Sequence, residues 1–103
     1  MAWTEIPLES QLQNDEVIPV TLGAFQLALY RSDDAYFVTD NICTHQHALL
    51  SDGFLEDGCI ECPLHQARFD IRTGEALCAP ATSGIRTYPI KVDGERVWVE
   101  LQG

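Results

Sequence analysis

The chain has 103 residues, of which 46% are hydrophobic and 21% charged. These fractions are typical of one small soluble domain and exclude a disordered chain. Six basic residues face sixteen acidic ones, for a formal net charge of −10. This acidity argues against binding to nucleic acids or anionic membranes and favours partners with basic faces, although solubility alone also explains it.

The chain shows no targeting or membrane-spanning segment. Residues 1–16 have neither the basic nor the apolar region of a signal peptide. The most apolar stretch, Val17–Tyr30, is too short to span a bilayer and is interrupted by Pro19 and Gly23. We therefore expect one cytoplasmic domain over residues 1–103.

Short strands separated by tight turns are predicted along the whole chain. Turns are indicated at Leu22-Gly23, Ser32–Asp34, Asp52-Gly53, Asp57-Gly58, Thr73-Gly74 and Asp93-Gly94. The expected strands are, in order, Trp3–Pro7, Val17–Val20, Phe25–Tyr30, Tyr36–Thr39, Phe54–Glu56, Ile60-Glu61, Phe69–Ile71, Glu75–Leu77, Thr87–Val92 and Arg96–Leu101. Only Pro7–Gln13 has a helical pattern, for a single turn. The fold class is all-β, an antiparallel sandwich or small barrel.

Two short motifs carry the chemistry. Cys43-Thr44-His45 is followed, after sixteen residues, by Cys62-Pro63-Leu64-His65. A Rieske [2Fe–2S] centre needs two thiolates on one iron and two imidazoles on the other. Each motif supplies one thiol and one imidazole, so two loops can hold a two-iron unit between them. The pattern predicts a Rieske centre and an electron-transfer protein.

Two alternatives explain the same residues. A structural zinc site also mixes cysteine and histidine, but its usual spacing is C-x(2–4)-C with a distant H-x(3–5)-H. A metal-free coincidence is the other. The mixed pairs at Cys43/His45 and Cys62/His65 favour the iron–sulfur centre.

The chain resembles the Rieske-type ferredoxins of bacterial aromatic-ring-hydroxylating dioxygenases. The likeness covers nearly the whole chain and is carried by Asp40–His45 and Glu61–Asp70, with Thr73-Gly74, Ala79-Pro80 and Tyr88–Val92. It implies that Cys43 and Cys62 bind the inner iron and that His45 and His65 bind the outer iron, near the surface. It also implies a cluster-binding subdomain over about residues 40–82. The implied partners are an NADH-dependent flavin reductase and a terminal oxygenase.

Two departures from respiratory and photosynthetic Rieske proteins bear on stability and potential. Those proteins carry a further cysteine in each loop, where this chain has Ala48 and Leu64, so no bridge between the loops is expected. They also place a serine and a tyrosine where this chain has Ala67 and Phe69. Hydrogen bonds to cluster sulfur stabilise the reduced state, so their loss predicts a low reduction potential.

Other residues receive less specific interpretations. His47 is expected in a surface loop or in tuning docking, and Leu49, His47 and Pro80 are expected to rim the contact surface. Pro80 shapes a third loop or is a simple turn proline. Cys59 and Cys78 are expected to be buried small side chains rather than a disulfide. Trp3 and Trp98 are expected to pack on strands.

Three other function classes are alternatives to an electron carrier. A terminal oxygenase also needs a mononuclear iron held by two histidines and a carboxylate, but only His47 remains of three histidines after the two motifs. A reductase is disfavoured because no G-x-G-x-x-G occurs. A small Rieske-type redox subunit, as in some nitrite reductases, remains the alternative. We expect a carrier that is not catalytic alone, and the substrate, oligomeric state and roles of Cys59 and Cys78 stay open.

Overall fold

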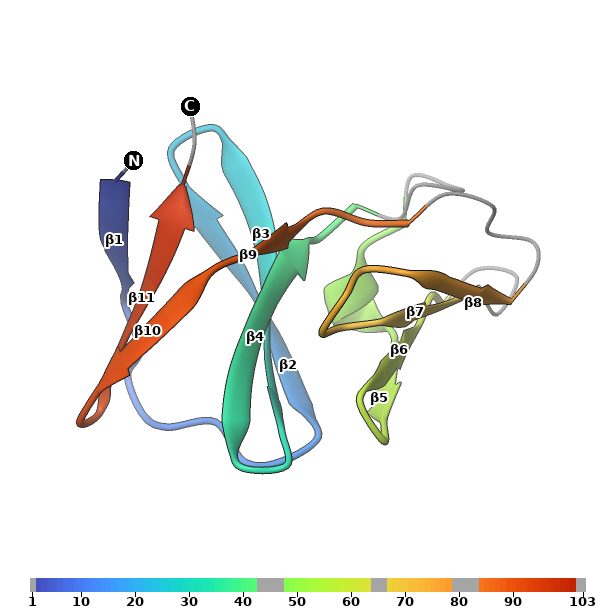
Figure 1. Cartoon of the computed structure of the whole chain (residues 1–103), viewed down its shortest axis with the longest axis horizontal. Helices are drawn as coiled ribbons and strands as arrows, with labels where there is room; N and C mark the ends of the chain where they lie inside the picture. Colours follow the sequence, from blue (N-terminus) through green and yellow to red (C-terminus); the bar gives the residue numbers. More distant parts are fainter. Residues whose placement is uncertain (1, 43–47, 64–66, 79–83, 102–103) are drawn as a thin grey trace.

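The computed structural model describes residues 2–42, 48–63, 67–78 and 84–101 (Figure 1). Within these ranges the chain forms eleven β-strands and one short 3-10 helix, η1 (Leu50–Asp52). The strands are β1 (Ala2–Ile6), β2 (Glu16–Leu22), β3 (Phe25–Ser32), β4 (Ala35–Asp40), β5 (Phe54–Glu56), β6 (Cys59–Glu61), β7 (Arg68–Asp70), β8 (Ala76–Cys78), β9 (Thr87–Tyr88), β10 (Ile90–Asp93) and β11 (Arg96–Leu101). No helix in the described ranges is long and apolar enough to cross a membrane.

The strands form three antiparallel sheets. Their strand orders are β1-β11-β10, β2-β3-β4-β9 and β5-β6-β7-β8. The first two sheets lie next to each other, and the third is inserted between β4 and β9, on the far side of β2–β4 from β1 (Figure 1). The all-β antiparallel prediction is confirmed.

Strand β3 is buried on both faces and divides two cores. Successive side chains of a strand point to opposite faces. Leu27 and Leu29 therefore pack into one core, whereas Ala28 and Tyr30 pack into a second core. The buried members of the second core are Ala28, Tyr30, Ala48, Leu50, Ile60, Cys62, Ala67, Phe69, Ile71 and Ile85. The second core joins the β5–β8 sheet to the rest of the molecule.

Two hairpins turn through backbone conformations with positive φ. Asp33 and Asp34, between β3 and β4, have φ of 54° and 63°, and Asp57 and Gly58, between β5 and β6, have 52° and 77°. Two consecutive positive φ angles suit the right-handed twist of the paired strands, and Asp and Gly adopt them at least cost. Both turns were predicted from the sequence.

The predicted strand Thr87–Val92 is wrong as one element. Pro89 divides it into β9 and β10, which belong to different sheets. β9 pairs with β4, whereas β10 pairs with β11. Proline has no N–H for a strand ladder, and its carbonyl accepts instead from the amide of Glu100 at 3.0 Å.

The helical turn predicted at Pro7–Gln13 is also wrong, because residues 7–13 contain no helix. The backbone groups of Leu12 bond to side chains of β3 and β4 instead. The amide donates to the Tyr36 hydroxyl at 3.2 Å, and the carbonyl accepts from Arg31 Nη1 at 2.8 Å. These bonds satisfy the backbone groups that a helix would otherwise pair.

Candidate metal centre

Of the four predicted ligands, Cys62 lies in the described part of the chain. It follows β6 and is only 1% exposed, inside the second core. Its amide donates to the carbonyl of Ala67 at 2.7 Å, which closes the segment 62–67 at its base. Cys43, His45 and His65 lie outside the described residues, as do His47, Leu64 and Pro80.

The second core brings together the bases of both predicted ligand loops. Ala48 follows the segment 43–47 directly, and Cys62 and Ala67 flank the segment 64–66. All three are buried in the second core, at 8%, 1% and 0% exposed. Ala48 and Ala67 have the small side chains that a bulky group next to the Cys62 thiol would require. A buried thiol in the core from which two segments with further thiol and imidazole donors in their sequence start fits a [2Fe–2S] group.

The segment 43–47 is held at both ends by hydrogen bonds. The Asn41 carbonyl accepts from the Leu50 amide at 2.7 Å, and Ile42 and Leu49 form an isolated antiparallel bridge. The Asn41 side chain adds two bonds to Ser51, one to its amide at 2.8 Å and one to its hydroxyl at 3.0 Å. None of these bonds was predicted from the sequence, because they form between residues seven to ten positions apart.

Asp40, at the end of β4, is attached to the chain that follows the segment 79–83. Its amide donates to the carbonyl of Arg86 at 2.9 Å, and its carboxylate accepts from the hydroxyl of Tyr88. The guanidinium of Arg86 lies 4.9 Å from the centre of the Tyr88 ring. Burial, and secondarily the bond to Asp40 and its charge, raise the pKa of Tyr88 to about 12. Tyr88 therefore stays protonated as a donor at neutral pH.

Two glycines allow backbone segments near the predicted loops to approach closely. A Cβ on Gly53 would lie 2.0 Å from the carbonyl oxygen of Glu61, the residue before Cys62. A Cβ on Gly74 would lie 2.0 Å from the carbonyl oxygen of Ile85, and the Ile85 amide donates to the Gly74 carbonyl at 2.8 Å. The sequence marked both glycines as turn residues but did not indicate these contacts.

Exposed apolar side chains flank the three internal segments outside the described ranges. Ile42 and Leu49 are 41% and 40% exposed on either side of 43–47, and Leu77, close before 79–83, is 44% exposed. Pro63 is also exposed. Leu49 was expected in such a rim, whereas Ile42 and Leu77 were not.

The two remaining cysteines need one correction. Cys59 is only partly buried, in β6, and its thiol lies 3.9 Å from the carbonyl oxygen of Asp57. It was expected to be buried. Its neighbours across the sheet explain the difference, since Cys59 pairs with Asp70 and Glu56 while Ile60 faces the second core.

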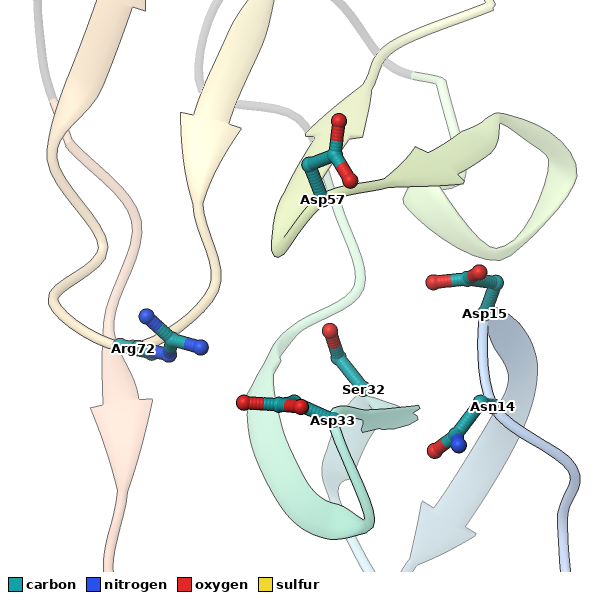
Figure 2. A pocket seen from close by; sticks show the side chains of 6 residues that line it. All are labelled: Asn14, Asp15, Ser32, Asp33, Asp57 and Arg72. Carbon is teal, nitrogen blue, oxygen red and sulfur yellow. The ribbon is translucent and has the colours of Figure 1, made fainter.

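A polar pocket of about 400 Å³ lies elsewhere in the fold. Asp57 and Arg72 enter it from the β5–β8 sheet, and Asn14, Asp15, Ser32 and Asp33 from the β2–β4 side (Figure 2). No predicted ligand is among these lining residues. The pocket adds to the acidic surface but is separate from the predicted metal centre.

Comparison with known proteins identifies the family. The family model described as the Rieske [2Fe-2S] domain matches residues 2–89. The chain belongs to the Rieske [2Fe–2S] family. The resemblance and the [2Fe–2S] cofactor predicted from the sequence are confirmed.

Similar proteins show which members of the Rieske family this chain resembles. The ferredoxin component of the naphthalene 1,2-dioxygenase system of Pseudomonas aeruginosa is 48% identical over 96% of this chain and 95% of its own. A ferredoxin of Sphingomonas yanoikuyae B1 superposes with a TM-score of 0.83 at 38% identity, over 87% of this chain and 89% of that one. A chain from the complex of reduced oxygenase and oxidised ferredoxin in carbazole 1,9a-dioxygenase gives 0.88 at 33% identity, over 94% of this chain and 100% of that one. This Rieske protein is therefore similar to dioxygenase-system ferredoxins over nearly its full length.

Proposed function

We propose that this Rieske protein carries single electrons from an NADH-dependent flavin reductase to the Rieske centre of a terminal aromatic-ring dioxygenase. The observation that supports this most directly is the 48% identity to a ferredoxin component of a dioxygenase system, over 95% of the length of that ferredoxin. The carbazole dioxygenase complex of a similar chain supports direct docking on an oxygenase.

The proposed ligands are Cys43 and Cys62 for the inner iron and His45 and His65 for the outer iron. The burial of Cys62 in the second core supports a deep position for the thiolate side of the centre. The proposed cluster-binding subdomain spans about residues 40–82 within a single domain, and β4 and β9 on either side of it support these limits. When bound, a Rieske cluster supplies one-electron storage at a potential raised by its two neutral imidazole ligands.

The residues that share the second core with Cys62 are buried from solvent. Ala67 and Phe69 are fully buried beside it in the second core. The three histidines of the chain leave no facial triad once His45 and His65 are used, so we propose that the protein is not catalytic alone. We propose a cytoplasmic location, where NADH is available.

Reconstitution tests this function. The purified, reduced protein is mixed with oxidised terminal oxygenase of a naphthalene dioxygenase system, and the visible spectra of both centres are followed. In parallel, a flavin reductase and NADH are used to reduce the oxidised protein. Transfer at both steps, with hydroxylated product, is expected. Transfer to a nitrite reductase flavoprotein but not to any aromatic-ring oxygenase would contradict the proposal and favour the alternative small-subunit role.

A further inference from the structure

Asn41 is a buried polar residue, only 3% exposed, whose hydrogen bonds tie together the two ends of the segment 43–47. Its amide donates to the carbonyl of Gln26 on β3 at 3.0 Å, and its carbonyl accepts from the Leu50 amide at 2.7 Å. Its side-chain Oδ1 accepts from the Ser51 amide at 2.8 Å, and its Nδ2 donates to the Ser51 hydroxyl at 3.0 Å. Asn41 therefore binds β3 on one side and the start of η1 on the other.

These contacts connect the first predicted ligand loop to the core that contains Cys62. Leu50, bonded to Asn41, is fully buried in the second core together with Cys62. Gln26 belongs to β3, the strand whose residues Ala28 and Tyr30 face the same core. A shift of Asn41 would therefore move one end of the segment 43–47 relative to Cys62.

The side chain of asparagine suits this place for a chemical reason. It has one acceptor and one donor on a single short arm, and here the acceptor takes the Ser51 amide while the donor reaches the Ser51 hydroxyl. Alanine would leave the partly buried Ser51 groups without these partners, which costs free energy and releases the loop end. Residues that hydrogen-bond around a metal site orient the ligands, and removing such a residue commonly changes the metal affinity about 10–100-fold.

We propose that Asn41 is a positioning residue for the [2Fe–2S] centre, fixing the loop of Cys43 and His45 relative to Cys62. This inference rests on the proposed ligand assignment. Asn41 acts on the cluster through the loop end and touches neither electron partner. It thus sets the geometry of the centre as well as the stability of the fold.

The chain offers a matched control at Asn14. The Asn14 side chain makes the same pair of bonds to Asp34, donating to its carboxylate at 3.0 Å and accepting from its amide at 2.8 Å. This pair is exposed and joins the β2 and β3–β4 ends rather than a ligand loop. Asn14→Ala therefore removes a similar side-chain pair without touching the predicted centre.

The experiment compares the holoprotein with Asn41→Ala, Ser51→Ala and Asn14→Ala. The readouts are the electron paramagnetic resonance g values of the reduced protein, its reduction potential, and the half-time of iron release to a chelator. We expect Asn41→Ala to shift the g values and potential and to release iron about 10–100-fold faster. Ser51→Ala, which removes only the hydroxyl partner, should change them less and in the same direction. Asn14→Ala should leave all three unchanged.

Two results separate the failure of this proposal from failure of the ligand assignment. Unchanged g values, potential and iron release in both Asn41→Ala and Ser51→Ala, while Cys62→Ala loses the centre, would overturn the positioning role alone. Normal iron and sulfide in Cys62→Ala would overturn the ligand assignment itself. If Asn41→Ala does not fold, the graded effect of Ser51→Ala decides the question.

Discussion

The amide of Cys62 donates to the carbonyl oxygen of Ala67 at 2.7 Å, and both side chains are buried in the second core. This single bond closes the second predicted ligand loop at its base. A substitution that moves the backbone of Ala67 would therefore also move Cys62. Residues 62 and 67 therefore form the base of the predicted loop that carries His65.

Substituting Cys62 should remove the centre, whereas substituting Cys59 should not. Cys62→Ala deletes one of two proposed thiolates on the inner iron, and metal binding in such sites is coupled to folding of the loops. Cys59→Ala is the matched control, since Cys59 lies three residues earlier and is only partly buried. Iron and acid-labile sulfide, measured on both purified variants, should fall to near zero in Cys62→Ala only.

The same test extends to the other three ligands. Cys43→Ala, His45→Ala and His65→Ala should each prevent assembly, because each leaves one iron short of a donor. Two irons and two sulfides per chain retained in any of these variants would show that the ligand set is wrong.

The reduction potential should lie at the low end of the Rieske range, on the order of −150 mV. Ala67 and Phe69 are fully buried and stand where respiratory and photosynthetic Rieske proteins place a serine and a tyrosine, so this chain lacks those two hydroxyl donors. Ala67→Ser with Phe69→Tyr should raise the potential, as measured by voltammetry, because donors to sulfur stabilise the more negative reduced state. A wild-type potential above about +100 mV, within the family range, would sink this explanation.

Gly53 should tolerate no side chain. Its Cβ would lie 2.0 Å from the carbonyl of Glu61, so Gly53→Ala must displace the strand that leads into Cys62. Overpacking of this kind costs about 1–3 kcal/mol or more. Gly94→Ala is the control, since its Cβ meets nothing within 4 Å and only its φ of 61° is strained, at about 1–2 kcal/mol. The temperature of thermal unfolding and the iron content should both fall further in Gly53→Ala than in Gly94→Ala. Equal iron content in the two variants would contradict the proposed effect of the Gly53–Glu61 contact on the centre.

Turn residues in the sequence predicted two strands to the residue. Phe54–Glu56 and Arg96–Leu101 match β5 and β11, because Asp57-Gly58 and Asp93-Gly94 mark their turns without ambiguity. The segment Thr87–Val92 failed because alternation identifies a strand but not the sheet that it joins. Pro89 was the available signal for the break.

Some residues of the candidate site could be predicted from the sequence and others could not. Cys62 was identified by motif spacing, which is a local property of the chain. Asn41 was missed as a site residue because its role depends on hydrogen bonds to Ser51, which the fold brings next to it from ten positions further along the chain. Likewise, Gly53 was interpreted as a turn residue, although its contact with Glu61 appears only in the packed fold.

Stability should fall at alkaline pH through Tyr88. Its pKa is raised from 10.0 to about 12, mainly by burial, so the folded state holds the phenolic proton more tightly than the unfolded state. Its contribution is constant below pH 10 and is lost as the pH rises from 10 towards 12. The difference in unfolding free energy between wild type and Tyr88→Phe should therefore shrink over this interval, by up to about 2 kcal/mol.

Chemical denaturation at pH 9, 10, 11 and 12 measures this difference. Comparing the two variants cancels the contribution of Tyr30, whose pKa is also raised by burial. A gap between wild type and Tyr88→Phe that stays constant across these pH values would show that Tyr88 titrates alike in both states.

Electron exchange with the reductase should slow as salt is added. The chain has a net charge of −10, and long-range attraction to a basic partner face is screened over about 8 Å at physiological ionic strength. The exposed apolar residues Ile42 and Leu49 flank the predicted loop of His45, so we expect acidic residues to steer the encounter and this rim to form the contact. Ile42→Ser should then lower the rate at every salt concentration and leave its salt dependence unchanged, because it removes apolar contact without changing charge. Stopped-flow rates under second-order conditions that stay flat or rise between low and high salt would rule out electrostatic steering and leave docking to the apolar rim.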